Sequence, residues 1–247
     1  MSPGSFTFEP AFLVLPAAAG LAYARAARGD APGRWRCASF ATGLVLVAAS
    51  LNSPLETIAA HYLLLIHLLQ NALIADVAPP LLLLGLTPRM RASLATRFPW
   101  PRARVALPIW LAAWYGTHAA GFYDWALRSG WALELEHGIL IAAGLLFWWA
   151  LVAGRLSTAA ALGYLGAGFV TSAFLGLAYI FSTRAFYGFY VHAPRLWGLS
   201  PVRDQNLGGI LMNAEQTAVF FVAIGFFLWR LLEEEGLSQA GESREVR

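Results

Sequence analysis

Five histidines are the residues of this chain with the most evident chemistry, because neutral imidazole is the commonest metal ligand in proteins. Three of them lie in separate apolar segments, namely His67, His118 and His137. A single histidine in an apolar helix is often only a hydrogen-bonded packing residue. Three at a similar depth favour a shared metal site, and the thioether of Met212 in a fourth segment favours Cu(I). We therefore predict a metal site with His67, His118 and His137 as ligands and Met212 as a further candidate; imidazole suits Cu, Zn and Fe, and the thioether shifts the preference toward copper.

The composition indicates what surrounds these residues. The chain has 247 residues, of which 58% are hydrophobic and 13% are charged. A soluble domain of this length does not bury so much apolar surface, so we expect most of the chain to lie in lipid. The 17 basic residues are all arginine, and they lie between apolar runs instead of forming one patch, so nucleic acid is not an expected partner. Cys37 is the single cysteine, which excludes a disulfide framework and a paired-cysteine metal site.

Seven segments are predicted as transmembrane helices, because such a helix needs about 20 mainly apolar residues. They are 9–25, 36–52, 60–86, 105–122, 132–153, 161–182 and 206–231. We therefore predict an all-α fold, a polytopic membrane protein with a bundle of seven transmembrane helices. The predicted parts are a transmembrane domain over residues 1–232 and a polar, frayed cytoplasmic tail over residues 233–247.

The arginines predict the orientation of this bundle. Thirteen of the 17 fall in the connections and tail on one side of the predicted membrane, and the others fall on the opposite side. Because positive residues collect on the cytoplasmic side, we expect the N-terminus outside and the C-terminus in the cytoplasm. Every histidine then falls in the outer third of the bilayer or beyond it, at a rise of about 1.5 Å per residue. The arginine pattern and the histidine positions are independent, and together they predict one polar layer at the outer face.

Polar residues near the histidines are candidates for supporting roles. Asn71 lies four residues after His67, on the same face of the third predicted span. Asp204 and Gln205 precede the seventh span. Asp204 is expected to cap that helix, and the alternative is that it orients a histidine ligand.

The third span contains a second polar feature, the sequence Asp76-Val77-Ala78-Pro79-Pro80. Two prolines remove two backbone donors, so we predict a break in the helix at this point. Asp76 is expected to cap the restarted half-helix, and the alternative is a role in proton relay or ion coupling.

Several short patterns occur in a fixed order along residues 45–235. They are His67-Leu68-Leu69-Gln70 before Ala78-Pro79-Pro80-Leu81-Leu82; Trp114 to His118 before Phe122-Tyr123-Asp124; Leu135-Glu136-His137 before Phe147-Trp148-Trp149; and Ser200-Pro201 before Asp204-Gln205, Gly208-Gly209 and Met212. As an ordered set they resemble the multi-span CtaG-type cytochrome c oxidase assembly factors. The resemblance implies a seven-helix protein of the bacterial cell membrane that is needed to mature a haem–copper oxidase. It implies copper delivery at the outer face, and a binding protein that is not an enzyme.

The resemblance also implies partners and supporting residues. The expected partners are the lipid bilayer, cytochrome c oxidase subunits and a copper donor protein, and Asp124 joins Asn71, Asp204 and Gln205 as a supporting residue. The family usually has the pattern His-Met-x-x-His in the third span, and Asn71 occupies the second histidine position here. An amide binds copper poorly compared with imidazole, so this ligand is missing unless His61, His192 or Met212 replaces it.

Three other functions remain as alternatives. Two histidines on different helices are able to ligate haem, as in a membrane cytochrome. A metal or proton transporter would use the break at Pro79 and Pro80 as a gate in the middle of the membrane. A metal-dependent membrane enzyme is the third alternative, although the sequence offers few carboxylates at the outer side.

Overall fold

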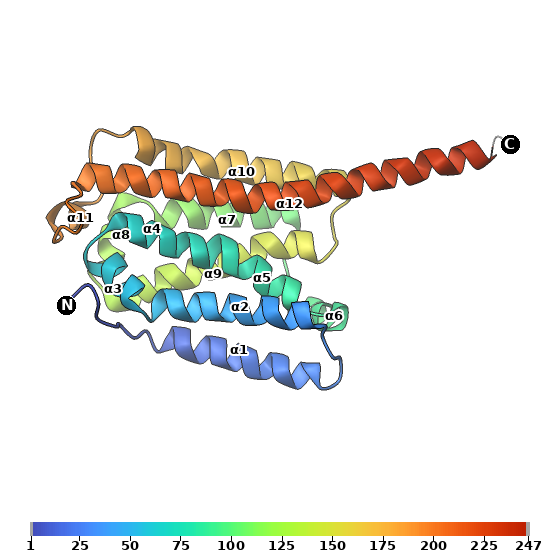
Figure 1. The fold of residues 1–247 in the computed structure, drawn as a ribbon, viewed down its shortest axis with the longest axis horizontal. Helices are drawn as coiled ribbons and strands as arrows, with labels where there is room; N and C mark the ends of the chain where they lie inside the picture. Colours follow the sequence, from blue (N-terminus) through green and yellow to red (C-terminus); the bar gives the residue numbers. More distant parts are fainter. Residues whose placement is uncertain (1, 246–247) are drawn as a thin grey trace.

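The computed structural model describes residues 2–245, and these residues form helices joined by loops (Figure 1). No strand occurs among them, which confirms the all-α prediction. The elements are α1 (Ala11–Ala27), α2 (Arg34–Leu51), α3 (Pro54–His61), α4 (Leu64–Ala72), the π-helical turn η1 (Leu73–Val77), α5 (Ala78–Gly85), α6 (Pro88–Arg97), α7 (Ala103–Thr117), α8 (Ala120–Ala126), α9 (Gly130–Val152), α10 (Thr158–Phe181), α11 (Gly188–His192) and α12 (Pro201–Glu245).

Fewer helices have the length of a straight membrane span than the sequence predicts. Four are long and apolar enough, and they are Leu64–Gly85, Gly130–Val152, Thr158–Phe181 and Pro201–Leu237. The pair α2 and α3 is a fifth candidate, although the two helices are bent by 49°. The predicted first and fourth spans form α1 and α7, which have 17 and 15 residues and so fall below the usual length of about 20. By length and composition, residues 2–245 therefore contain four candidate spans, or up to five.

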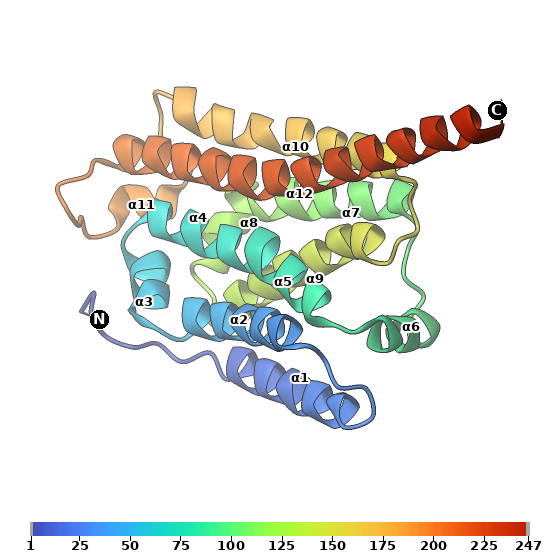
Figure 2. The same ribbon diagram turned by 45° about the vertical axis from the view of Figure 1, so that its right-hand side comes forward.

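The long helices lie side by side along one common axis, as Figures 1 and 2 show. α10 packs along α12, α12 packs along α4, and α1 lies at the edge against α2. The short helices α3, α8 and α11 gather at one end of the bundle, and α6 lies at the opposite end. All five histidines belong to the first of these ends, which we call the histidine end; the opposite end is the α6 end.

The last helix extends beyond the bundle at the α6 end (Figure 1). α12 continues through residues 233–245 of the predicted tail, so the prediction of a frayed segment is wrong for these residues. Residues 246 and 247 of that tail lie outside the described residues. The division of the chain at residue 232 stays a prediction.

The predicted break in the third span is a π-helical turn instead. η1 joins α4 to α5, and the prolines occupy the first turn of α5, where a missing backbone N–H costs little. Asp76 does not cap α5, since that helix begins after Val77 without a side-chain hydrogen bond. The turn packs directly on α9, because a Cβ added at Gly144 would lie 2.2 Å from the carbonyl oxygen of Ala75. The π-helical turn therefore keeps the span continuous, and its backbone is in close contact with Gly144.

α12 runs parallel to the α4–α5 span in a constant register. The Asp204 carboxylate meets Leu64 at the start of α4, and Gln216 meets Asp76 in η1; in both pairs the residues are 140 apart in the chain. Between these contacts, Gly208 lets the Leu68 side chain approach, since a Cβ at Gly208 would lie 2.7 Å from it. The glycine therefore allows the two helices to approach closely, as small residues do in membrane helices.

Candidate metal site at the histidine end

The hydrogen bonds of the three predicted histidine ligands leave one ring nitrogen of each without a partner. All three side chains are buried, and the unpartnered atom is Nε2 in His67, His118 and His137. Nδ1 of His118 lies 2.7 Å from the backbone carbonyl of Trp114, which only accepts, so Nδ1 carries the hydrogen. Nε2 of this ring therefore presents a lone pair. A metal-binding histidine usually has this arrangement, with its other N–H held by a carbonyl or carboxylate.

His67 has the same arrangement through a tyrosine. The Tyr190 hydroxyl donates to the carbonyl of Ala59 at 2.6 Å, and Nδ1 of His67 lies 2.9 Å from the same hydroxyl oxygen. Because the hydroxyl hydrogen is already used, Nδ1 of His67 donates and Nε2 keeps its lone pair. Nδ1 of His137 lies 3.3 Å from the Glu9 carboxylate, which again accepts. The three rings thus share one tautomer, with Nε2 free to bind a metal.

Two of the three rings contact a buried tyrosine, and the third is a neighbour of one of them. The centroids of His67 and His137 are 5.8 Å apart, so these two side chains are neighbours. The Tyr123 ring lies 4.8 Å from His67 and 5.7 Å from His118. The Tyr123 ring therefore contacts both His118 and His67, and His67 is in turn a neighbour of His137. All three histidines belong to one buried region.

Glu136 links His67 to Asn71. Its Oε1 lies 3.6 Å from Nε2 of His67 and accepts a hydrogen bond of 3.1 Å from the Asn71 amide. The shared carboxylate places His67 and Asn71 on one helical face, as their spacing predicts. The second oxygen of Glu136 is buried without a partner. This carboxylate is therefore available to a metal ion bound between His67 and His137.

A second group of metal-binding type adjoins the first, and sequence reasoning missed two of its members. Glu9, Glu56 and His137 are buried, and one donor atom from each lies within 4.8 Å of the others. Glu9 lies in the segment before α1. The backbone N–H of Glu9 donates to the Asn52 side chain. Glu56 lies in α3 and accepts a hydrogen bond from Gln70. The available signal was that both glutamates flank apolar segments at the end that carries the histidines.

The predicted supporting residues hold helix starts and a loop in place. Asp204 does not cap its own helix as predicted; its carboxylate accepts hydrogen bonds from the backbone N–H groups of Leu64 and Leu65, both at 2.9 Å. It therefore caps α4, the helix of His67. Asp124 accepts from the first N–H groups of α11, the helix of Tyr190, and Gln205 holds the loop before α11 through Arg184 and Phe186.

The remaining candidates lie apart from the buried rings or show no contact with them. Met212 is buried in the hydrophobic cluster that also includes Leu64 and Leu68. His61 and His192 are exposed, and both line a shallow hollow of about 450 Å³ at the histidine end. Whether any of these three residues binds metal stays a prediction.

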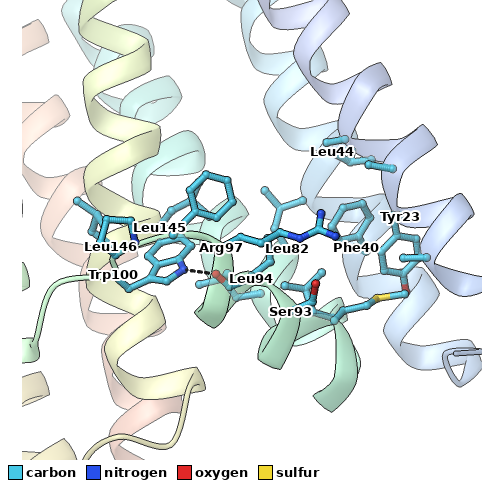
Figure 3. A pocket seen from close by; sticks show the side chains of 18 of the residues that line it. Tyr23, Phe40, Leu44, Leu82, Ser93, Leu94, Arg97, Trp100, Leu145 and Leu146 are labelled. Carbon is cyan, nitrogen blue, oxygen red and sulfur yellow. Dashed lines mark hydrogen bonds between the residues drawn. The ribbon is translucent and has the colours of Figure 1, made fainter.

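A different hollow lies at the α6 end (Figure 3) and has a volume of about 640 Å³. Its lining is mostly apolar and comes from α1, α2, α5, α6, the loop after it and α9. Tyr23 stacks on Phe40 on one side, Trp100 donates to the Leu94 carbonyl on the other, and Arg97 reaches in from α6. No histidine or carboxylate is among the described residues that line it, so its lining differs in kind from the candidate metal site.

The fold and the comparisons define the protein. The described residues form an all-helical bundle with four helices, or up to five, that are long and apolar enough to cross a membrane. The sequence matches the family model of the cytochrome c oxidase caa3 assembly factor (Caa3_CtaG) over residues 18–234, and the chain belongs to this family. No curated protein and no solved structure is similar enough to the chain to match it.

Proposed function

We propose that this member of the caa3 assembly factor family binds copper at the histidine end and delivers it to a cytochrome c oxidase subunit. The observation that supports the proposal most strongly is the set of three buried imidazoles, His67, His118 and His137, with unpartnered Nε2 atoms. A buried polar atom normally has a hydrogen-bond partner, so three unpartnered ring nitrogens in one region are best explained by a ligand. Copper is the cargo in this proposal, and the protein binds and releases it without catalysing a reaction.

The donor atoms favour copper with mixed nitrogen and oxygen ligands. Imidazole binds copper in both oxidation states, whereas carboxylates favour the harder Cu(II). Glu9, Glu56 and Glu136 supply such carboxylates next to His67 and His137. Met212 stays the thioether candidate for Cu(I). The expected site is therefore able to hold copper in either oxidation state.

The proposed topology places this site where delivery is useful. We infer seven membrane spans, with α1, α7 and the bent pair α2 and α3 included. The arginine pattern then places the N-terminus and the histidine end outside the bacterial cell membrane and the C-terminus in the cytoplasm. The four candidate spans and the family support a membrane location.

Copper content of the purified protein tests the proposal. Wild type, His67→Ala and the control His192→Ala are loaded with copper, and bound metal is measured in competition with a copper chelator. His67→Ala should lose most of the bound copper because it removes a buried donor, whereas His192→Ala should keep it because His192 is exposed. Equal copper in wild type and His67→Ala would refute the proposal. A strong haem absorption band in the purified protein would instead support the cytochrome alternative.

The missing family histidine provides a gain-of-function variant. Asn71 lies one turn from His67 and shares Glu136 with it. Asn71→His should therefore add a donor and tighten copper binding relative to wild type.

A cysteine placed near residue 95 tests the proposed orientation, which puts this segment in the cytoplasm. Labelling of that cysteine from the outside would contradict the orientation.

A further inference from the structure

Two acidic residues lie deeper along the helix axes than the histidines, near the middle of the bundle. Asp76 is the thirteenth residue of the 22-residue span Leu64–Gly85, and its side chain is fully buried. It lies in the π-helical turn η1, and such turns are frequent at functional sites. Gln216 of α12 donates to its Oδ2 at 3.4 Å, and Oδ1 has no partner. One carboxylate oxygen at the centre of the span is thus without any hydrogen bond.

The second acidic residue is Glu215, which precedes Gln216 in α12. Both oxygens of its carboxyl group are buried without a hydrogen-bond partner. Glu215 is next in the chain to Gln216, whose side chain contacts Asp76, so the two acidic residues come from adjoining positions of α12 and η1. Gln216 also accepts a hydrogen bond of 3.2 Å from the Ser172 hydroxyl, so a polar connection joins η1, α12 and α10.

No positive side chain compensates these carboxyl groups among the described residues. Neither Asp76 nor Glu215 takes part in any of their ion pairs. The elements packed against η1 are α2, α4, α5, α9 and α12, and on α12 the acidic residue Glu215 precedes Gln216, the hydrogen-bond partner of Asp76. On α9, the nearest ionisable residue toward the histidine end is His137, seven residues before Gly144 and about 10 Å away along the axis.

The surroundings of Asp76 and Glu215 determine the charge that their carboxyl groups are able to carry. A buried carboxylate without a cation or sufficient hydrogen bonds is strongly unfavourable in an apolar medium, and two that interact are more so. Each group therefore has to be neutral or to share a bound cation. We propose that Asp76 and Glu215 form a proton-binding carboxyl pair, which holds protons at neutral pH and exchanges them with water through the polar groups of the bundle.

Infrared spectroscopy of the full-length protein in detergent or liposomes tests this proposal. A protonated carboxyl group has a C=O stretching band distinct from that of a carboxylate. We expect such bands at neutral pH, a shift of these bands on transfer to D₂O, and the loss of one component in Asp76→Asn and of another in Glu215→Gln. The matched control is Glu235→Gln, which changes an exposed residue of the same helix and should leave the bands unchanged.

A chemical label gives a second measurement that needs no variant. A hydrophobic carbodiimide adds a protonated carboxyl group across its C=N bond, so it should modify Glu215 of the wild type at neutral pH and be found there by peptide mass spectrometry. The absence of both protonated bands and label would overturn the proposal. Bands that do not shift in D₂O would also overturn it, since the protons would not exchange. Loss of bands and label on adding sodium at constant ionic strength would assign a cation site instead.

Measurements of copper binding distinguish this proposal, the proton-binding carboxyl pair, from the proposed function in copper delivery. Asp76→Asn and Glu215→Gln leave every residue of the histidine end intact, so both variants should bind copper as the wild type does. Failure of the copper proposal would therefore leave the infrared result unaffected.

Discussion

The Asp204 carboxylate accepts a hydrogen bond of 2.9 Å from the backbone N–H of Leu64, although the two residues are 140 apart in the chain and lie on different helices. The other oxygen of the carboxylate accepts from the next backbone N–H. The negative charge also lies at the positive N-terminal end of α4. One buried side chain therefore fixes α12 against the start of the helix that carries His67, and the position of the imidazole depends on a residue that does not contact it.

Removing this cap should destabilise the bundle and weaken metal binding together. Asp204→Ala leaves the backbone N–H groups of Leu64 and Leu65 without their partner, and we expect a loss of about 1–3 kcal/mol in unfolding free energy. Thermal unfolding in detergent and copper affinity measure the two effects. The control is Arg203→Ala, an exposed neighbour, which should change neither. Unaltered copper affinity in a clearly destabilised Asp204→Ala would show that the cap has no influence on His67.

Tyr190→Phe should weaken metal binding with little loss of packing. The change removes only the hydroxyl that joins Nδ1 of His67 to the Ala59 carbonyl, so the ring loses the partner that fixes its tautomer and orientation. Loss of such an outer partner typically costs 10–100-fold in metal affinity, and we expect about tenfold here. Chelator competition measures it. Tyr115→Phe removes an exposed hydroxyl on α7 and serves as the control.

Glu9→Gln should affect Cu(II) more than Cu(I). The substitution keeps the size of the side chain but removes one of the two carboxylates beside His137. Carboxylate oxygen suits the harder ion, so its loss should weaken Cu(II) binding and leave the imidazole contribution to Cu(I). Separate titrations under oxidising and reducing conditions measure the two affinities. An equally small change in the Cu(I) and Cu(II) affinities of Glu9→Gln would exclude Glu9 as a ligand. An equal change in the control variant Glu134→Gln would also exclude it.

The hydrophobic pattern predicted the all-helical fold but not how the apolar runs divide into helices, since the predicted run 105–122 forms α7 and the start of α8. The spacing of His67 and Asn71 also predicted that they share one helical face, and both side chains lie next to Glu136. The contribution of Glu9 could not be predicted in this way, because it depends on how a segment before the first helix folds over the end of the bundle. Asp204 was assigned to the wrong helix for a related reason. Capping rules follow neighbours in sequence, whereas this carboxylate caps a helix 140 residues away.

The prolines illustrate a different limit. Pro79 and Pro80 predicted a broken helix, but the structure keeps the span continuous through η1. A wider turn satisfies the local backbone only when the neighbouring helix leaves room for it. That room comes from Gly144 on α9, which is separated from the prolines by more than 60 residues of sequence. The local pattern identified the site of the irregularity but not its form.

Gly144→Ala tests this dependence of the π-helical turn on α9. The new Cβ would lie 2.2 Å from the Ala75 carbonyl oxygen, so backbone must move and the turn must shift. We expect destabilisation of about 1–3 kcal/mol, as for other overpacked interiors. The matched control is Gly138→Ala in the same helix, where the added methyl meets no atom within 4 Å. Alanine favours a helix over glycine by about 1 kcal/mol, so this control should be neutral or stabilising. Thermal unfolding of both variants measures the difference, and equal stability of the two would contradict a tight contact between α9 and the turn.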